Sequence, residues 1–293
     1  MVIPPAYIAT MRSTIDTLID RTGNLLKSQP NDATVGSAAM NDIATSARPE
    51  SILTAISIGD IALEHSADHL SAFNKLVDEP IETLACFTCI RSMLETAAIG
   101  AWVLAPNLST KERIARVFAV RFDGMEQQLK FGNCINVGAT ELQNLEQRII
   151  NIENDATTIG YPAFRNKNNK IYAIGMVMPG ATEMIRDVLN DERIYRLLSA
   201  VAHGHSWAIT QLGFKNAQAN PVTITGGNVH LLEKKVYVDS LALIGLHGVL
   251  AFALLAWNKF KYLGLDVLKM EEILEDTADT LNANVQLRFW RTP

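Results

Sequence analysis

The chain has 293 residues, which is enough to bury a sizeable hydrophobic core. Hydrophobic residues make up 48% and charged residues 19%, and this balance excludes disorder on a large scale. The net charge of −5 argues against a broad basic surface that would bind duplex nucleic acid through many phosphates. Cys86, Cys89 and Cys134 are too few for a disulfide framework, so we expect a reducing, cytoplasmic setting.

Apolar residues recur with the helical period along nearly the whole chain, which predicts an all-α fold, a bundle of about eight helices. Pro49 suits the first turn of one helix, and Ser109 with Glu112 has the spacing of a capping box. We expect helices at residues 5–27, 49–77, 80–105, 110–130, 140–155, 191–213, 234–264 and 266–285, with a short one at 181–189.

Three stretches break the helical pattern. Residues 28–48 are polar and rich in small side chains, so we expect a mobile loop there. Residues 160–180 and 216–232 are two irregular insertions, the first with one short strand and the second with the pattern of a small β-hairpin around Gly226 and Gly227. Nothing marks a domain boundary, so we predict a single all-α domain over residues 1–293.

Residues 240–257 are nearly all apolar and close to the roughly 20 residues that span a bilayer. His247 lies in their middle, where a polar side chain is costly in lipid. We therefore favour a buried core helix, which is also apolar all round. The alternative is a membrane-associated protein anchored through this segment.

The predicted helix at 191–213 has a divided surface. Its apolar side gathers Ile194, Leu197, Leu198, Val201, Ala208 and Ile209. The other side gathers Glu192, Arg196, Ser199, His203, Trp207 and Thr210. Arg196 and His203 are seven residues apart and therefore lie two turns apart on one face. An arginine and a histidine so placed can bind an anion and move a proton, although a solvated face and a protein interface remain alternatives.

Neighbouring residues support this polar stripe. Glu192 precedes Arg196 by four positions, the favourable order for a helical ion pair. Ser199 lies one turn before His203 and is placed to hydrogen-bond its ring. His205 falls near the middle of the apolar face, so we expect a core histidine there.

Arg91 and Glu95 lie four residues apart in the predicted helix at 80–105, which is apolar in nearly every direction. Buried charges must be paired, so the two side chains form either a structural link between helices or part of a pocket. Arg121 lies at the edge of the next helix, where it can pair with Glu95 or bind an anion. Arg113 and Arg116 point away from the apolar face, and we expect them in solvent.

The sequence holds weak signals for metal chemistry. His65 and His69 have the spacing of a helical metal site, but no second set of ligands accompanies them. Cys86 and Cys89 lack a second cysteine pair and are expected as core residues. We therefore predict no metal and no cofactor.

Two segments resemble a known superfamily. The run at 89–95, followed by Trp102, and the run at 195–204 are similar to helices of poorly characterised bacterial all-helical proteins related to the HEPN superfamily. That superfamily is marked by an arginine, four to six residues, and a histidine, and Arg196 and His203 are separated by six. The resemblance covers residues 81–130 and 191–206.

The resemblance implies a helical bundle that cleaves RNA without a metal, usually across the interface of a homodimer, in defence or stress response. Arg196 would hold the scissile phosphate, and His203 would act as general acid or base. Arg91, Glu95 and Arg121 would shape the site, with Ser199 and Glu192 in support. Many HEPN-like proteins are inactive, so the alternative is a helical interaction or dimerisation module without catalysis.

Overall fold

The computed structural model describes residues 6–30, 33–217, 222–225 and 227–282, and this part of the chain is predominantly helical. The all-α class predicted from the sequence is confirmed. The helices are α1 (Ala6–Lys27), α2 (Ala38–Thr45), α3 (Pro49–Leu76), α4 (Ala85–Val103), α5 (Thr110–Cys134), α6 (Ala139–Thr158), α7 (Ala181–Met184), the π-helix η1 (Ile185–Leu189), α8 (Glu192–Ala202), α9 (Ser206–Gly213), α10 (Val238–Leu263) and α11 (Val267–Thr280).

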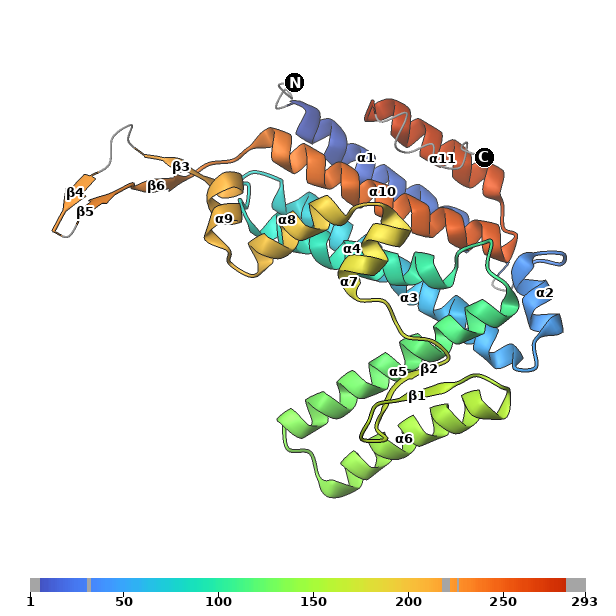
Figure 1. Ribbon diagram of the computed structural model, residues 1–293. Coiled ribbons are helices and arrows are strands. Elements are labelled where there is room, and N and C mark those ends of the chain that lie inside the picture. The colour runs from blue at the N-terminus through green and yellow to red at the C-terminus, as the bar shows by residue number, and fades with distance from the viewer. Residues whose placement is uncertain (1–5, 31–32, 218–221, 226, 283–293) are drawn as a thin grey trace.

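Six short strands form three antiparallel pairs within these residues. They are β1 (Ala163–Arg165) with β2 (Ile171–Ile174), β3 (Phe214–Asn216) with β6 (Leu232–Lys234), and β4 (Val222–Ile224) with β5 (Gly227–Val229). The pairs that include β3 to β6 extend away from the helices (Figure 1), in the region where the sequence predicts a hairpin.

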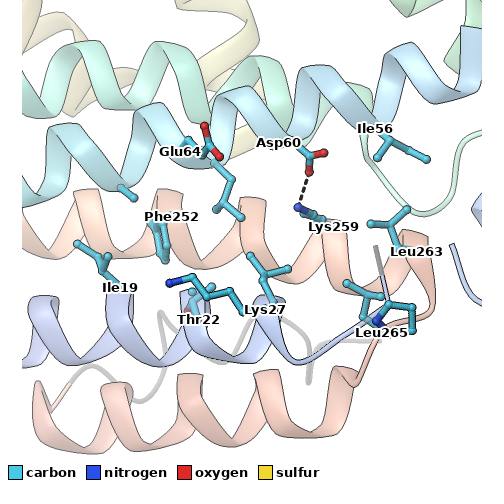
Figure 2. A pocket seen from close by; sticks show the side chains of 15 residues that line it. Ile19, Thr22, Lys27, Ile56, Asp60, Glu64, Phe252, Lys259, Leu263 and Leu265 are labelled. Atoms are coloured by element: carbon cyan, nitrogen blue, oxygen red, sulfur yellow. Dashed lines mark hydrogen bonds and ion pairs between the residues drawn. The ribbon is translucent and has the colours of Figure 1, made fainter. Parts of the chain in front are cut away.

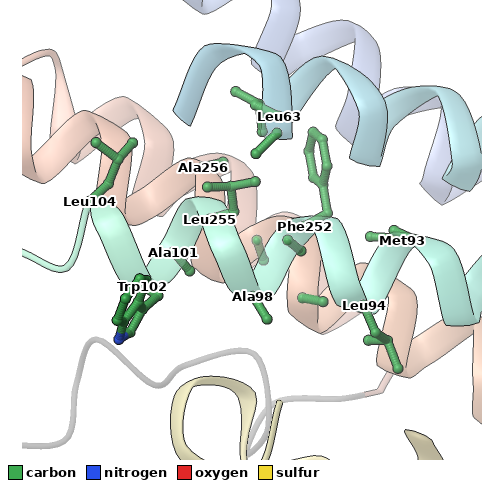
Figure 3. Packing of buried hydrophobic residues seen from close by; sticks show 14 of the residues in the cluster. Leu63, Met93, Leu94, Ala98, Ala101, Trp102, Leu104, Phe252, Leu255 and Ala256 are labelled. Carbon is green, nitrogen blue, oxygen red and sulfur yellow. The ribbon is translucent and has the colours of Figure 1, made fainter. Parts of the chain in front are cut away.

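The central layer consists of α3, α4 and α10, which pack closely against one another (Figure 3). Gly100 of α4 makes this close approach possible. A Cβ at this position would lie 2.6 Å from the Cβ of Ala62 on α3 and 2.8 Å from the side chain of Leu255 on α10. Leu94 and Phe252 are among the buried side chains that fill the layer. On the far side of α10, α1 and α11 complete the bundle (Figure 1).

The helix α10 is long and apolar enough to cross a membrane by length and composition, and 61% of its most apolar window is buried inside the fold. Burial between α1, α3 and α4 explains a helix that is apolar all round without a membrane. A core helix and a membrane span meet the same criterion of composition, so the anchor remains a hypothesis from the sequence.

The local signals in the sequence act at several helix ends. The α3 helix begins at Pro49, as predicted. The capping box at the start of α5 is present, because Ser109 Oγ accepts from the Glu112 N–H at 3.2 Å and Glu112 accepts from the Ser109 N–H at 3.0 Å. The α4 helix begins only at Ala85, not at Pro80. The expected loop at 28–48 contains α2, capped by the side chain of Ser37.

A buried ion pair joins α2 to α5. Arg113 Nε of α5 donates to Asp42 Oδ2 of α2 at 3.0 Å, and the Arg113 side chain is 0% exposed. The two guanidinium Nη groups of Arg113 donate to the carbonyl oxygens of Val103, the last residue of α4, and Ala105, just beyond it. The expectation that Arg113 lies in solvent is therefore wrong. Arg113 lies outside the apolar stripe of α5, but α2 covers it with a carboxylate.

Tyr262 of α10 completes this cluster. Its hydroxyl donates to Asp42 Oδ2 at 3.0 Å, and its ring lies 3.7 Å from the Arg113 guanidinium. The Thr110 hydroxyl donates to the other carboxylate oxygen of Asp42 at 2.5 Å. Burial raises the pKa of Tyr262. We call Asp42, Arg113 and Tyr262 the buried cluster, and it ties α2, α5 and α10 together.

Arg116 also departs from the prediction of a solvated arginine. Its Nη1 donates to the carbonyl oxygen of Trp102 at 2.5 Å, and its guanidinium lies 4.8 Å from the Trp102 ring. Burial lowers the pKa of Arg116. Together with Arg113 it fixes the start of α5 on the end of α4, from which α5 and α6 project as an arm (Figure 1).

We expect Arg113→Met to lower the free energy of unfolding by about 3 to 5 kcal/mol, because it leaves the Asp42 carboxylate buried without its cation. Urea denaturation followed by circular dichroism measures the effect. Asp276→Asn is the control, since it breaks an exposed ion pair with Arg21 and is expected to cost less than about 1 kcal/mol. A similar small loss for Arg113→Met would contradict a structural role for the buried cluster.

Candidate functional site

The segment predicted as one helix at 191–213 is two helices. The α8 helix ends at Ala202, and α9 begins at Ser206. Gly204 has a φ of +73°, the left-handed conformation that glycine adopts most easily. The N–H of His205 bonds to the carbonyl of Ala200 at 2.9 Å and that of Gly204 to the carbonyl of Val201 at 3.0 Å, the two bonds of a Schellman motif. His203 is therefore the C-cap of α8.

This break changes the surroundings of His205. The expectation of a core histidine is wrong, because His205 is exposed at the corner between α8 and α9. Its ring centre lies 6.4 Å from that of His203, which is also exposed. Trp207 of α9 is 54% exposed beside them in the sequence. In a continuous helix His205 would lie on the apolar face. The left-handed conformation of Gly204 ends α8 and changes the direction of the chain, so His205 lies in solvent instead.

The polar residues expected on the outer face of α8 are accessible. Arg196 Nε donates to Glu192 Oε1 at 2.8 Å, which confirms the predicted pairing, and the Arg196 side chain remains 67% exposed. Ser199 bonds to His203 through its backbone carbonyl, which accepts the His203 N–H at 3.0 Å. We call Glu192, Arg196, Ser199 and His203 the α8 stripe.

Tyr195 lies at the edge of the α8 stripe and docks the helix on α4. The Tyr195 hydroxyl donates to Glu95 Oε1 at 2.6 Å, and Arg91 Nη2 lies 2.8 Å from the same oxygen. The Arg91 guanidinium lies 5.7 Å from the Tyr195 ring centre. Burial, and then the bond to Glu95, raises the pKa of Tyr195. The contact between Arg91 and Glu95 is as predicted. Tyr195 makes it a link between two helices, and Glu95 also lines a cavity of about 300 Å³, so both predicted alternatives are represented.

The two ionic pairs belong to different surroundings. Glu95 is bonded to Arg91 and Tyr195 on α4 and α8, whereas Arg196 is bonded to Glu192 in solvent. The described residues show no contact between the two pairs. Tyr195 and Arg196 are consecutive, so one helix presents a docking residue to α4 and a charged residue to solvent.

Arg121 lies elsewhere. It lines a shallow cavity of about 240 Å³ between α5 and α6, together with Met125, Arg148, Asn151 and Ile152. Glu95 is bonded to Arg91 rather than to Arg121. Arg121 and Arg148 both line this cavity, and two cations at one cavity are compatible with the anion binding expected for Arg121. This cavity is separate from the α8 stripe.

A larger cavity of about 440 Å³ lies between α1, α3 and α10 (Figure 2). Its walls are mainly apolar, and an ion pair between Asp60 of α3 and Lys259 of α10 crosses it. Lys27 and Glu64 also line it. The hydroxyl of Thr22 is buried there, with no hydrogen-bond partner in the part of the chain that the structure describes.

Sequence reasoning missed the partner of His247. Its Nδ1 lies 2.7 Å from Asp191 Oδ2, immediately before α8. The sequence does contain a signal for this contact. His247 is a single histidine in an otherwise apolar helix, and a buried polar group requires a hydrogen-bond partner. Among the described residues, no group of three or more histidine, cysteine or acidic side chains is placed to hold a metal ion.

Comparison with known proteins gives no match to this chain, whether against family models, curated proteins or solved structures.

We expect Tyr195→Phe to lower the free energy of unfolding by about 1 to 2 kcal/mol at pH 7, because it removes a hydrogen bond to a charged group. The raised pKa of Tyr195 means that the unfolded chain loses this proton first as pH rises above about 10. The wild type therefore loses stability there, and the difference between the two proteins shrinks.

Urea denaturation at pH 7 and above pH 10 measures this difference. Tyr172→Phe serves as the control, since Tyr172 is exposed on β2. A difference between wild type and Tyr195→Phe that grows with pH would contradict the assigned hydrogen bond.

We expect Thr22→Val to stabilise the protein by roughly 1 kcal/mol, because it removes an unpartnered buried hydroxyl and keeps the side-chain shape. Thr14→Val on the same helix is the matched control. The Thr14 hydroxyl donates to the Thr10 carbonyl at 2.8 Å, so its loss is expected to be neutral or destabilising. Thermal or urea unfolding compares the two variants, and equal effects would show that the Thr22 hydroxyl has a partner.

Proposed function

We propose that this chain is a HEPN-like protein that cleaves single-stranded RNA without a metal, with Arg196 and His203 as the catalytic pair. The observation that carries the proposal is the exposure of both side chains on one face of α8. The opposite face is buried through Leu198 and Val201, and Tyr195, at the edge of the stripe, bonds to Glu95 of α4. An RNA strand can reach the α8 stripe without any rearrangement of the bundle.

The chemistry follows from the residue types. His203 in its neutral form takes the proton of a ribose 2′-hydroxyl, and the 2′-oxygen attacks the adjacent phosphorus. Arg196 donates to the phosphate oxygens, where negative charge increases in the transition state. The bond from phosphorus to the 5′-oxygen breaks, and this oxygen takes a proton. His205, whose ring centre lies 6.4 Å from that of His203, is placed to supply it when protonated.

The remaining features of the surface suit a single strand. Trp207 is exposed beyond the two histidines and offers a ring on which a base can stack. The overall charge of −5 restricts binding to a small local site, in keeping with a short stretch of RNA. In a homodimer, as the resemblance implies, two α8 stripes would contribute to one site.

A second candidate is an interaction module without catalysis. The ion pair between Arg196 and Glu192 favours it, because this contact already uses the Arg196 Nε that a phosphate would approach. In that case the α8 stripe and Trp207 form the surface that a protein partner or second copy covers.

We expect the purified protein to cleave mixed single-stranded RNA in excess EDTA, and His203→Ala and Arg196→Ala each to slow cleavage at least 100-fold. The matched control is His230→Ala, an exposed histidine on the segment between β5 and β6, which should retain wild-type activity. Circular dichroism confirms that each variant is folded.

Cleavage that His203→Ala leaves unchanged, or that EDTA abolishes, would contradict the proposed mechanism. No cleavage by the wild type would also contradict it and would favour the interaction module.

A further inference from the structure

A paired histidine lies at another cavity, next to the start of α8. The side chains of Asp191 and His247 are 9% and 24% exposed, and the oxygen and nitrogen that join them are 2.7 Å apart. The cavity beside them has a volume of about 420 Å³ and lies between η1, the start of α8 and α10. Its other lining residues are Val188, Leu189, Asn190, Leu250, Ala251 and Leu254.

The backbone at this cavity has two uncommon features. The η1 segment is a π-helix, a form that occurs mostly as single turns and often at functional sites. It ends at Asn190, which has a φ of +54° and a ψ of +37°, the left-handed region that asparagine enters more readily than most other residues with a side chain. These two features bring the chain round so that Asp191 faces α10. The same backbone conformation therefore forms one wall of the cavity and places Asp191 beside His247.

The bond to Asp191 fixes the chemistry of the His247 ring. An ionised carboxylate accepts the proton on Nδ1, so Nε2 is the nitrogen that remains for another partner. A hydroxyl group suits this nitrogen in either state of the ring, because it can donate to a neutral Nε2 or accept from a protonated one. A carboxylate ligand would instead be repelled by Asp191. The apolar walls add the preference for an apolar body.

We propose that this cavity binds a small neutral molecule with an apolar body and one hydroxyl group, a phenol or a similar alcohol, with His247 Nε2 as the partner of the hydroxyl. The site uses neither Arg196 nor His203 and is independent of RNA cleavage. Asp191 directly precedes Glu192, so the occupied cavity lies at the start of the helix that carries the α8 stripe.

The probes are 4-methylphenol and toluene, which share their apolar body and differ in the hydroxyl. Each is titrated into the full-length protein labelled with ¹⁵N at its six histidines, and the imidazole resonances are followed by NMR. We expect 4-methylphenol to shift the His247 resonances saturably and to bind about 10-fold more tightly than toluene.

Two variants separate binding from structure. His247→Phe is expected to remove the preference for 4-methylphenol over toluene. Leu254→Trp keeps Asp191 and His247 but fills the cavity from a half-buried position, and it is expected to abolish binding of both probes. Circular dichroism and urea denaturation check that each variant folds. If His247→Phe does not fold, Leu254→Trp still decides whether the probes occupy this cavity.

Three results would overturn the proposal. They are the absence of a saturable His247 shift, equal affinities of wild type for the two probes, and unchanged binding of 4-methylphenol by Leu254→Trp.

Discussion

The positions of α2, α5 and α10 relative to one another depend on one buried charge. The Arg113 guanidinium is removed from solvent, and each of its three nitrogens donates to a partner: Asp42, the Val103 carbonyl at the end of α4 and the Ala105 carbonyl just beyond it. Tyr262 bonds to the same carboxylate and stacks on the guanidinium. Because these residues come from α2, α5 and α10, none of the three helices can shift without exposing or orphaning a charge. The arm formed by α5 and α6 is thereby held on the α3, α4 and α10 layer.

Ionic contacts serve different purposes at different depths in this protein. The buried cluster fixes helices, and the half-buried contact of Arg91, Glu95 and Tyr195 docks α8 on α4. The pair of Glu192 and Arg196 is exposed and contributes little to stability. A docked helix with a charged outer face is a rigid support for chemistry in solvent. This division of the two faces of α8 is what favours the α8 stripe as the functional surface.

The sequence predicts the elements well where the evidence is local. Pro49 and the Ser109 capping box mark helix starts, and the four-residue spacing of Glu192 and Arg196 predicts their contact. Prediction from the sequence fails where the surroundings of a residue depend on contacts between distant segments of the chain. Arg113 lies outside the apolar stripe of its own helix, and only the folding of the segment before α3 into α2 buries it. The error at His205 has a local cause, because Gly204 is the glycine that typically ends a helix. The contact between Asp191 and His247 joins residues far apart in the sequence, and periodicity holds no information on it.

Backbone hydrogen exchange tests most directly whether the α8 stripe is the surface that binds RNA. Exchange is measured by mass spectrometry with and without a 2′-O-methyl RNA strand, which lacks the free hydroxyl needed for cleavage. We predict slower exchange at the end of α8 and the start of α9, over residues 199–210, and unchanged exchange in α5 and α6. Protection elsewhere on the protein, with none at residues 199–210, would contradict the assignment of this surface.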